Sequence, residues 1–148
     1  MRASHRLRLA LNLVNGSTLS GLAVARLGRA RLGRAGPAAG GQGGLLTAVG
    51  YRLPVPSAPA FTLGNVIITR RPWIDAEGDL FRHEARHATQ YAWCGGLLML
   101  PLYFTAAGVS WLLSGDVGAW NPFERLAGLA DGGYRDSPLR WPARNSAR

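Results

Sequence analysis

Lysine is absent from this sequence, and cysteine and histidine are scarce. All 17 basic residues are arginine, Cys94 is the single cysteine, and the chain has three histidines. One cysteine excludes an intrachain disulfide and the zinc sites that are built from several cysteines. A lone thiol is compatible with the reducing cytoplasm, where we expect the protein to reside.

Acidic residues are missing from the first half of the chain. Residues 1–74 carry ten arginines and no acid, whereas residues 75–148 carry seven arginines and all eight acids, so the formal charges of +10 and −1 sum to +9. A basic half can face an anionic membrane surface or nucleic acid, or it can simply be solvated. No aromatic residue interrupts the arginine cluster before Tyr51, so nucleic acid is the least favoured partner.

A long hydrophobic run is missing from the N-terminus but present later. The apolar run in MRASHRLRLALNLV breaks after about six residues, short of the roughly 7–15 of a secretory signal, so we expect no signal. Residues 95–113 form a stretch of 19 mostly apolar residues, at the lower limit for crossing a bilayer. Because Pro101 and three glycines weaken a spanning helix, we expect this segment to be buried or seated at a membrane interface, with spanning as the alternative.

The order of local patterns predicts an α+β fold in three parts. Residues 1–44 form a basic, partly helical segment with a helix, turn and helix at 8–25. We expect residues 26–44, which contain two RLGRA repeats and a glycine-rich loop, to be the least ordered region. Residues 45–135 form a metal-binding domain, and residues 136–148 form a frayed basic tail.

Strand patterns come first within the central part. Residues 60–63 and 66–69 are rich in β-formers and are joined by Gly64 and Asn65, a two-residue turn signal. The proline-rich segment 54–59 cannot lie in a central ladder, so we expect a small antiparallel sheet.

Two polar helices flank the apolar segment. The first runs from an N-cap at Asp79 to a stop at Gly95 and Gly96. The second, in NPFERLAGLADGGY, has Asn121 as N-cap and Pro122 at its first position, and we expect it to end at residues 132–133.

The first of these helices carries the pattern HExxH. His83 and His87 are four residues apart, so both imidazoles lie on one helix face and can bind one metal ion. Glu84 lies beside the first histidine, where it can take a proton from a water molecule and pass it to a leaving amine.

A catalytic zinc needs a third protein ligand, which lies elsewhere in the chain. The extended pattern HExxHxxGxxH is excluded, because Gln90 and Trp93 occupy its glycine and third histidine positions. Glu124 is the best candidate, because it begins a helix rich in small residues that follows the apolar segment. Asp131 is a candidate to orient a ligand histidine, and Tyr134 is a candidate to stabilise an oxyanion.

Each of these residues also has an ordinary structural interpretation. Two histidines one turn apart can be core residues or a pH-sensitive pair. Glu124 stands three residues after Asn121 and can complete a capping box. Asp131 can merely stabilise a turn before Gly132. The combination of HExxH on a helix with a later acidic helix favours metal binding.

With these motifs in place, the chain resembles small bacterial zincin-like domains of the gluzincin type, over about residues 45–135. The resemblance is carried by HEARHATQY, NPFERLAGLADGGY and AFTLGNVIITR. It implies a minimal zincin fold in which His83, His87 and Glu124 bind Zn²⁺ and Glu84 is the catalytic base. It also implies that the strand at 66–69 borders the cleft and can pair with an extended peptide.

The chain departs from larger gluzincin peptidases in two ways. Those enzymes often have an acid four residues after the ligand glutamate, where this chain has Gly128, and they carry a second lobe for which this chain has no residues. From the HExxH motif and the resemblance, we expect a zinc-dependent hydrolase of peptide bonds that acts on a peptide or protein. The alternatives are a non-catalytic, membrane-associated domain with a structural or vestigial metal site, or a basic nucleic-acid-binding protein.

Overall fold

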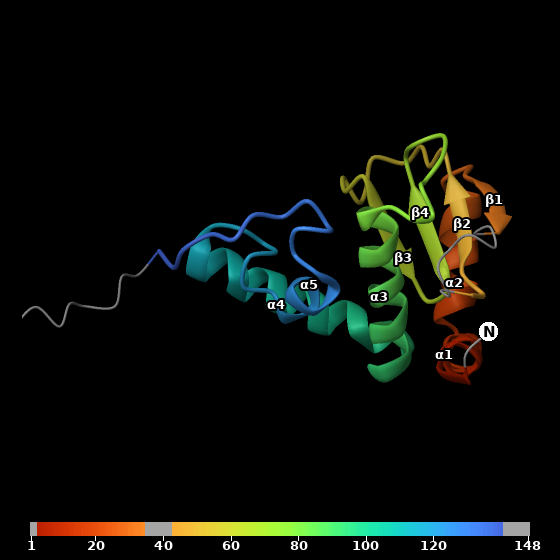
Figure 1. Cartoon of the computed structure of the whole chain (residues 1–148), viewed down its shortest axis with the longest axis horizontal. Helices are drawn as coiled ribbons and strands as arrows, with labels where there is room; N and C mark the ends of the chain where they lie inside the picture. Colours follow the sequence, from red (N-terminus) through yellow and green to blue (C-terminus); the bar gives the residue numbers. More distant parts are fainter. Residues whose placement is uncertain (1–2, 35–42, 141–148) are drawn as a thin grey trace, which may run out of the picture.

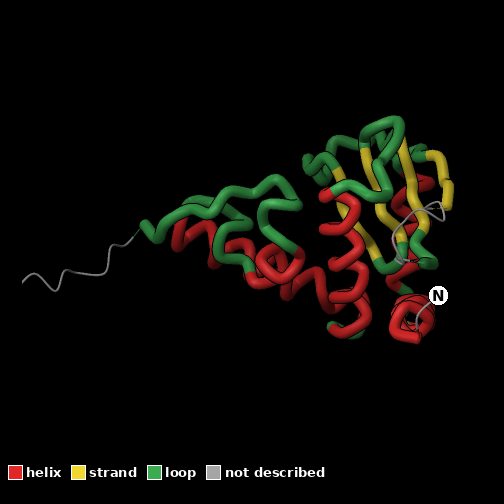
Figure 2. Tube along the Cα trace, in the orientation of Figure 1, coloured by secondary structure: helices red, strands yellow, loops and turns green. Residues whose placement is uncertain are grey.

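The computed structural model describes residues 3–34 and 43–140, which form helices on both faces of a small sheet (Figures 1 and 2). The predicted tail at 136–148 and glycine-rich loop at 36–44 lie mostly outside these residues. The elements are, in chain order, α1 (Ala3–Val14), α2 (Ser17–Leu27), β1 (Arg31–Arg34), β2 (Leu46–Val49), β3 (Ala60–Leu63), β4 (Val66–Thr69), α3 (Asp79–Trp93), a 3₁₀ turn η1 (Gly96–Leu98), α4 (Met99–Ser114) and α5 (Pro122–Ala127).

The α+β class is confirmed, and so is the hairpin of β3 and β4. Leu63 pairs with Val66 across Gly64 and Asn65, which form the predicted two-residue turn. Gly64 has a φ of 59°, a conformation that glycine adopts without strain. A Cβ atom there would also meet the backbone of α2 at Thr18, so the turn and α2 lie in close contact.

The prediction of a wholly antiparallel sheet is wrong at one pairing. The strand order is β1-β2-β4-β3, and β2 runs parallel to β4. The proline-rich connection at 50–59 carries the chain from β2 past the neighbouring position in the sheet. Strand β3 therefore lies at an edge, and its hairpin partner β4 lies between β3 and β2. All four residues of β4 are buried, as expected for a strand covered on both faces.

Alternate residues of β4 face two different helices. Ile67 packs with Phe81 and Ala85 of α3, whereas Val66 and Ile68 pack with Ala25 of α2. Strand side chains alternate between faces, so α3 and α2 cover opposite sides of the sheet (Figure 1). The core thereby fixes α3, the helix that carries HExxH.

The N-terminal segment is packed into the same core as residues 45–135. The predicted helix, turn and helix is confirmed as α1 and α2, and β1 forms at the second RLGRA repeat, where we expected little order. Asn12 of α1 donates to Ala88 O of α3 at 2.8 Å and to Asn65 Oδ1 at 3.1 Å. Because Asn12 is fully buried, these bonds join α1 firmly to α3 and to the hairpin turn.

Two predicted helix ends were misplaced. The N-cap of α3 is Gly78, and Asp79 is the first helical residue, where its carboxylate favours the positive helix end. The stop after α3 is confirmed, with Gly95 and Gly96 at φ of 74° and 83°. Helix α5 ends at Ala127, earlier than predicted, because Gly128 adopts a φ of 89° and turns the chain toward α3.

Helix α4 extends away from the sheet, with α5 and the following loop along one side of it (Figure 1). The helical stretch Gly96–Ser114 is long and apolar enough to cross a membrane. Only 22% of its most apolar 18 residues are buried, however. The expectation of a buried core helix is therefore wrong for most of its surface. Pro101 does not break α4, because it lies in the first turn, where its missing N–H has no helical partner.

Candidate metal centre

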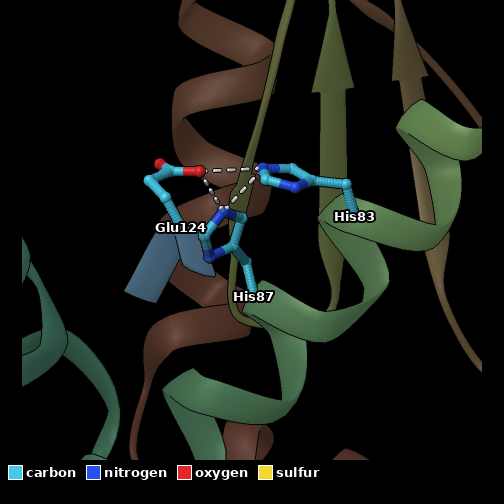
Figure 3. A group of neighbouring side chains, drawn as sticks. All are labelled: His83, His87 and Glu124. Carbon is cyan, nitrogen blue, oxygen red and sulfur yellow. Dashed lines mark hydrogen bonds and ion pairs between the residues drawn. The ribbon is translucent and has the colours of Figure 1, made fainter. Parts of the chain in front are cut away.

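His83, His87 and Glu124 converge, as the sequence predicted (Figure 3). The two histidines lie one turn apart on α3, and Glu124 lies in the first turn of α5, which packs against α3. Their relative exposures are 2%, 6% and 1%. Three ionisable side chains so deeply buried require partners or a bound ion.

The separations within this cluster suit a tetrahedrally coordinated metal ion. His83 Nε2 lies 3.0 Å from His87 Nε2, and Glu124 Oε2 lies 3.1 and 3.6 Å from these two nitrogens. Tetrahedral bonds of about 2.0–2.2 Å place neighbouring ligand atoms roughly 3.3 Å apart. The three atoms thus already occupy three corners of such a site.

The outer ring nitrogens explain why the inner ones are free to bind a cation. His83 Nδ1 lies 3.0 Å from Gly128 O, and His87 Nδ1 lies 2.7 Å from Gln90 Oε1. Both partners are acceptors, so each Nδ1 carries the proton in a neutral ring and each Nε2 presents a lone pair. Two lone pairs and a carboxylate oxygen would repel one another unless a proton or a metal cation lies between them.

Glu124 Oε2 gives the same indication. This atom is buried, and its close polar neighbours are the Nε2 atoms of His83 and His87, which have no proton to donate when both rings are neutral. Oε1 accepts a hydrogen bond from Tyr103 Oη on α4. An unsatisfied buried carboxylate oxygen is costly. The donor set and this orphaned oxygen therefore fit a metal ion.

The predicted N-cap explains how Glu124 is aimed. Asn121 Oδ1 accepts the backbone N–H of Phe123 at 3.0 Å, and Pro122 occupies the first helical position. The N–H of Asn121 itself donates to Gly118 O at 3.0 Å. Glu124 is thus not needed for a capping box, and its carboxylate is directed to the histidines and Tyr103.

Gln90 links the two ligand helices. Its Nε2 donates to Phe123 O at 2.8 Å, which leaves Oε1 to accept from His87. The side chain therefore orients one ligand and fixes the start of α5 at the same time. The sequence signal was the spacing of three residues from His87, which places both side chains on neighbouring turns.

Asp131 does not contact a ligand histidine, contrary to the role predicted for it. It binds Arg86 of α3 at 2.6 Å, and Arg86 also donates to Ala127 O at 2.6 Å. These bonds fasten the turn after α5 to α3. That turn supplies Gly128 O to His83, so Asp131 acts on the histidine only through the backbone.

The ring of His83 is also enclosed by glycine. A Cβ atom on Gly132 would lie 2.4 Å from His83 Cε1 and 2.7 Å from Nε2. Real Cβ atoms essentially never approach so closely, so the backbone can lie against the imidazole only because residue 132 has no side chain.

Two tyrosines complete the surroundings of the site. Tyr103 binds Glu124, a contact that no sequence pattern indicated. Tyr134, which was predicted, lies with its ring centroid 6.2 Å from that of His83 and lines a surface hollow with Arg125 and Asp136. Burial, followed by the charge of Glu124, raises the pKa of Tyr134 to about 12, so its hydroxyl remains a donor at neutral pH.

Glu84 is buried on the sheet side of α3. Its Oε2 accepts a hydrogen bond from Thr62 Oγ1 of β3 at 2.8 Å. Burial raises the pKa of Glu84, against the lowering effects of His87 and of the Thr62 hydrogen bond. A raised pKa suits a carboxylate that must accept and return a proton.

The ligand residues perturb one another's protonation. Burial lowers the pKa of His83, but the hydrogen bond to Glu124 and the charges of Glu84 and Glu124 outweigh burial and raise it. Burial raises the pKa of Glu124, but the two histidines outweigh burial and hold that pKa well below its usual range. When no metal is bound, Glu124 therefore favours the protonated form of His83, and the histidines favour the ionised form of Glu124.

Comparisons of the whole chain with protein-family models, with curated proteins and with solved structures find no match. The functional conclusions below therefore depend on the residues of this chain alone.

Proposed function

We propose that this protein is a zinc-dependent metallopeptidase in which His83, His87 and Glu124 hold the metal and Glu84 is the general base. The observation that carries the proposal is the convergence of two free imidazole lone pairs and one carboxylate oxygen at tetrahedral separations. When bound, zinc acts as a Lewis acid and lowers the pKa of water. Three protein ligands leave the fourth position open, as in catalytic zinc sites.

The donor set favours zinc over the other common divalent cations. Magnesium and calcium prefer six or more oxygen ligands, whereas this cluster offers two imidazole nitrogens and one carboxylate oxygen. The carboxylate is held by Tyr103, and each imidazole is held through its second nitrogen. This arrangement is typical of zinc sites whose ligands are oriented before the metal binds.

Glu84 moves the proton in the proposed reaction. Its carboxylate takes the proton of the water that attacks the carbonyl carbon, and passes it to the amide nitrogen as the C–N bond breaks. Tyr134 is proposed to donate its hydroxyl proton in a hydrogen bond to the oxygen that gains charge during the attack. Glu84 is buried and Tyr134 is half-buried, so water competes more weakly for the interactions of Glu84 than for those of Tyr134.

The substrate strand is proposed to add to β3. The strand at 66–69, expected to border the cleft, lies inside the sheet and cannot accept another strand. Strand β3 is one of the two edge strands of the described sheet, and its residue Thr62 contacts Glu84 directly. An extended peptide paired with β3 would thus run past the general base.

The deciding experiment compares the parent with Glu84→Gln after both are loaded with zinc. Glu84→Gln keeps the side-chain size and all three ligands, so it should retain zinc. It should lose about 10²–10⁴-fold in the hydrolysis of an unfolded protein substrate. Equal hydrolysis by both proteins, or no hydrolysis by a zinc-loaded parent on a broad peptide library, would contradict the proposal.

A second function, a non-catalytic domain with a structural metal, is favoured by the depth of the site. The side chains of His83, His87 and Glu124 are only 3%, 8% and 2% exposed. A closed site of this kind stabilises a fold without turnover. In that case zinc raises the melting temperature of the parent and of Glu84→Gln equally, and neither protein hydrolyses peptides.

A further inference from the structure

Helix α4 is apolar around its whole circumference but packs along only one narrow strip. Met99, Ala107 and Ser110 are buried, and they lie on a single face at helical spacing. The remaining exposed residues cover an arc of roughly 200°. On that arc the large apolar residues of α4 are Leu102, Phe104, Val109, Trp111, Leu112 and Leu113, and Leu97 and Leu98 of η1 are exposed next to them.

This surface does not resemble that of a soluble helix. A soluble surface helix has a polar outer face, whereas the stretch from Ala88 to Gly115 contains no charged residue. Patches of contiguous exposed apolar side chains mark binding surfaces. The exposed arc therefore needs an apolar environment.

The position of the chain that follows α4 limits how α4 can be oriented in a membrane. It returns along the inner face of the helix: Arg140 N donates to Leu113 O at 2.7 Å, and Trp120 N donates to Ser110 Oγ at 2.8 Å. Tyr103, further back on α4, binds Glu124. If α4 crossed a bilayer, Arg140 and Glu124, which are bound to it, would enter the hydrocarbon, and burying these charges there is costly.

We propose that α4 lies in the plane of an anionic membrane, with its exposed arc inserted among the acyl chains and its inner face carrying the metal centre. The stretch Gly96–Ser114 is about 28 Å long, and its axis would lie parallel to the membrane surface. Because Tyr103 joins the inner face of α4 to Glu124, the metal centre would lie one helix diameter, about 10 Å, above the membrane.

Three observations favour a bilayer over a second copy of the chain. One partner helix covers a stripe of about 100°, about half of the exposed arc, whereas lipid covers all of it. Trp93 and Trp111 are also exposed near the two ends of the helical stretch, where interfacial tryptophans anchor helices. The net charge of +9 adds attraction to anionic headgroups.

The test measures binding of the full-length protein to vesicles of phosphatidylcholine with a quarter of phosphatidylglycerol. The variant Leu98→Gln, Leu102→Gln, Leu112→Gln changes three exposed leucines of the arc and leaves the core intact. Its matched control is Leu7→Gln, Leu19→Gln, Leu27→Gln, which changes three exposed leucines of α1 and α2. We expect the arc variant to bind at least about tenfold more weakly than the parent, and the control to bind like the parent.

A depth measurement separates an in-plane helix from a spanning one. In a Cys94→Ala background, a fluorophore is attached to Leu98→Cys, Thr105→Cys or Leu112→Cys, which are seven residues apart on one face. Quenching by lipids brominated at known depths should place all three at the same shallow level. A spanning helix would place the label at residue 105 near the bilayer centre.

Three results would overturn the proposal. The first is no vesicle binding by the folded parent, and the second is loss of binding in the α1 and α2 control with retention in the arc variant. The third is a dimer of the parent in sedimentation that the arc variant abolishes, because it would assign the arc to a second copy. None of these readouts depends on zinc or on peptidase activity.

Discussion

His87 and Gln90 are joined at 2.7 Å through Nδ1 and Oε1, and this bond leaves His87 Nε2 free to face His83 and Glu124. The amide orientation of Gln90 is set by its second bond, to Phe123 O. One glutamine therefore selects the ring nitrogen that can bind a metal and also positions the helix that supplies the third ligand.

Replacing Gln90 tests this relationship. Gln90→Met keeps the length of the side chain but removes the acceptor, so we expect zinc affinity to fall about 10–100-fold. Gln90→Glu retains an acceptor for His87 and should bind zinc more tightly than the methionine variant. Competition with a chromophoric chelator measures both affinities, and equal affinities in parent and methionine variant would refute the orienting role.

Gly132 provides a steric test of the position of His83. A Cβ at this residue would overlap the imidazole, so Gly132→Ala must push His83 away from the other ligands. We expect at least about a tenfold loss of zinc affinity. Gly108→Ala is the control, because its Cβ would meet no atom within 4 Å. Unchanged zinc binding in Gly132→Ala would show that residue 132 does not lie against the imidazole of His83.

Tyr103→Phe tests the hydrogen bond to Glu124. Without metal, loss of a bond to a buried carboxylate should lower the free energy of unfolding by about 1.5–3 kcal/mol. Tyr51→Phe is the control, since the hydroxyl of Tyr51 makes a neutral bond to Val55 O, worth about 0.5–1.5 kcal/mol. Urea unfolding in the presence of a chelator ranks the two variants. A larger loss for Tyr51→Phe would contradict the assignment.

Stability should depend on pH in opposite directions with and without zinc. The pKa of His83 is raised in the folded protein, so the stabilisation that it gives the metal-free form is complete below about pH 6.5 and is lost as pH rises through the folded pKa. Zinc must displace that proton, so zinc binding strengthens as pH rises. Melting temperatures with chelator and with zinc should diverge as pH rises above about 6.5. Parallel curves would contradict proton displacement.

The sequence was most informative where local rules decide the structure. The spacing of His83 and His87 and the N-cap at Asn121 predicted the three residues of the cluster, because helical periodicity and capping act within a few residues. The Gly64–Asn65 turn was predicted for the same reason.

The sequence was least informative where tertiary contacts decide. The pentapeptide RLGRA occurs twice, and its first copy ends α2 whereas the second forms β1. Gly28 of the first copy lies against Tyr51, since a Cβ on Gly28 would meet its ring at 2.1 Å. No local rule distinguishes the two copies. The parallel pairing of β2 with β4 and the exposure of α4 likewise depend on distant segments.

The most direct test of the central claim is the metal content of the purified protein, measured for the parent, Glu124→Ala and Glu84→Gln by elemental mass spectrometry. We predict about one zinc per chain in the parent and in Glu84→Gln, and little or none in Glu124→Ala, because only the last variant removes a ligand. A parent without zinc, or a Glu124→Ala variant that retains as much zinc as the parent, would contradict the account.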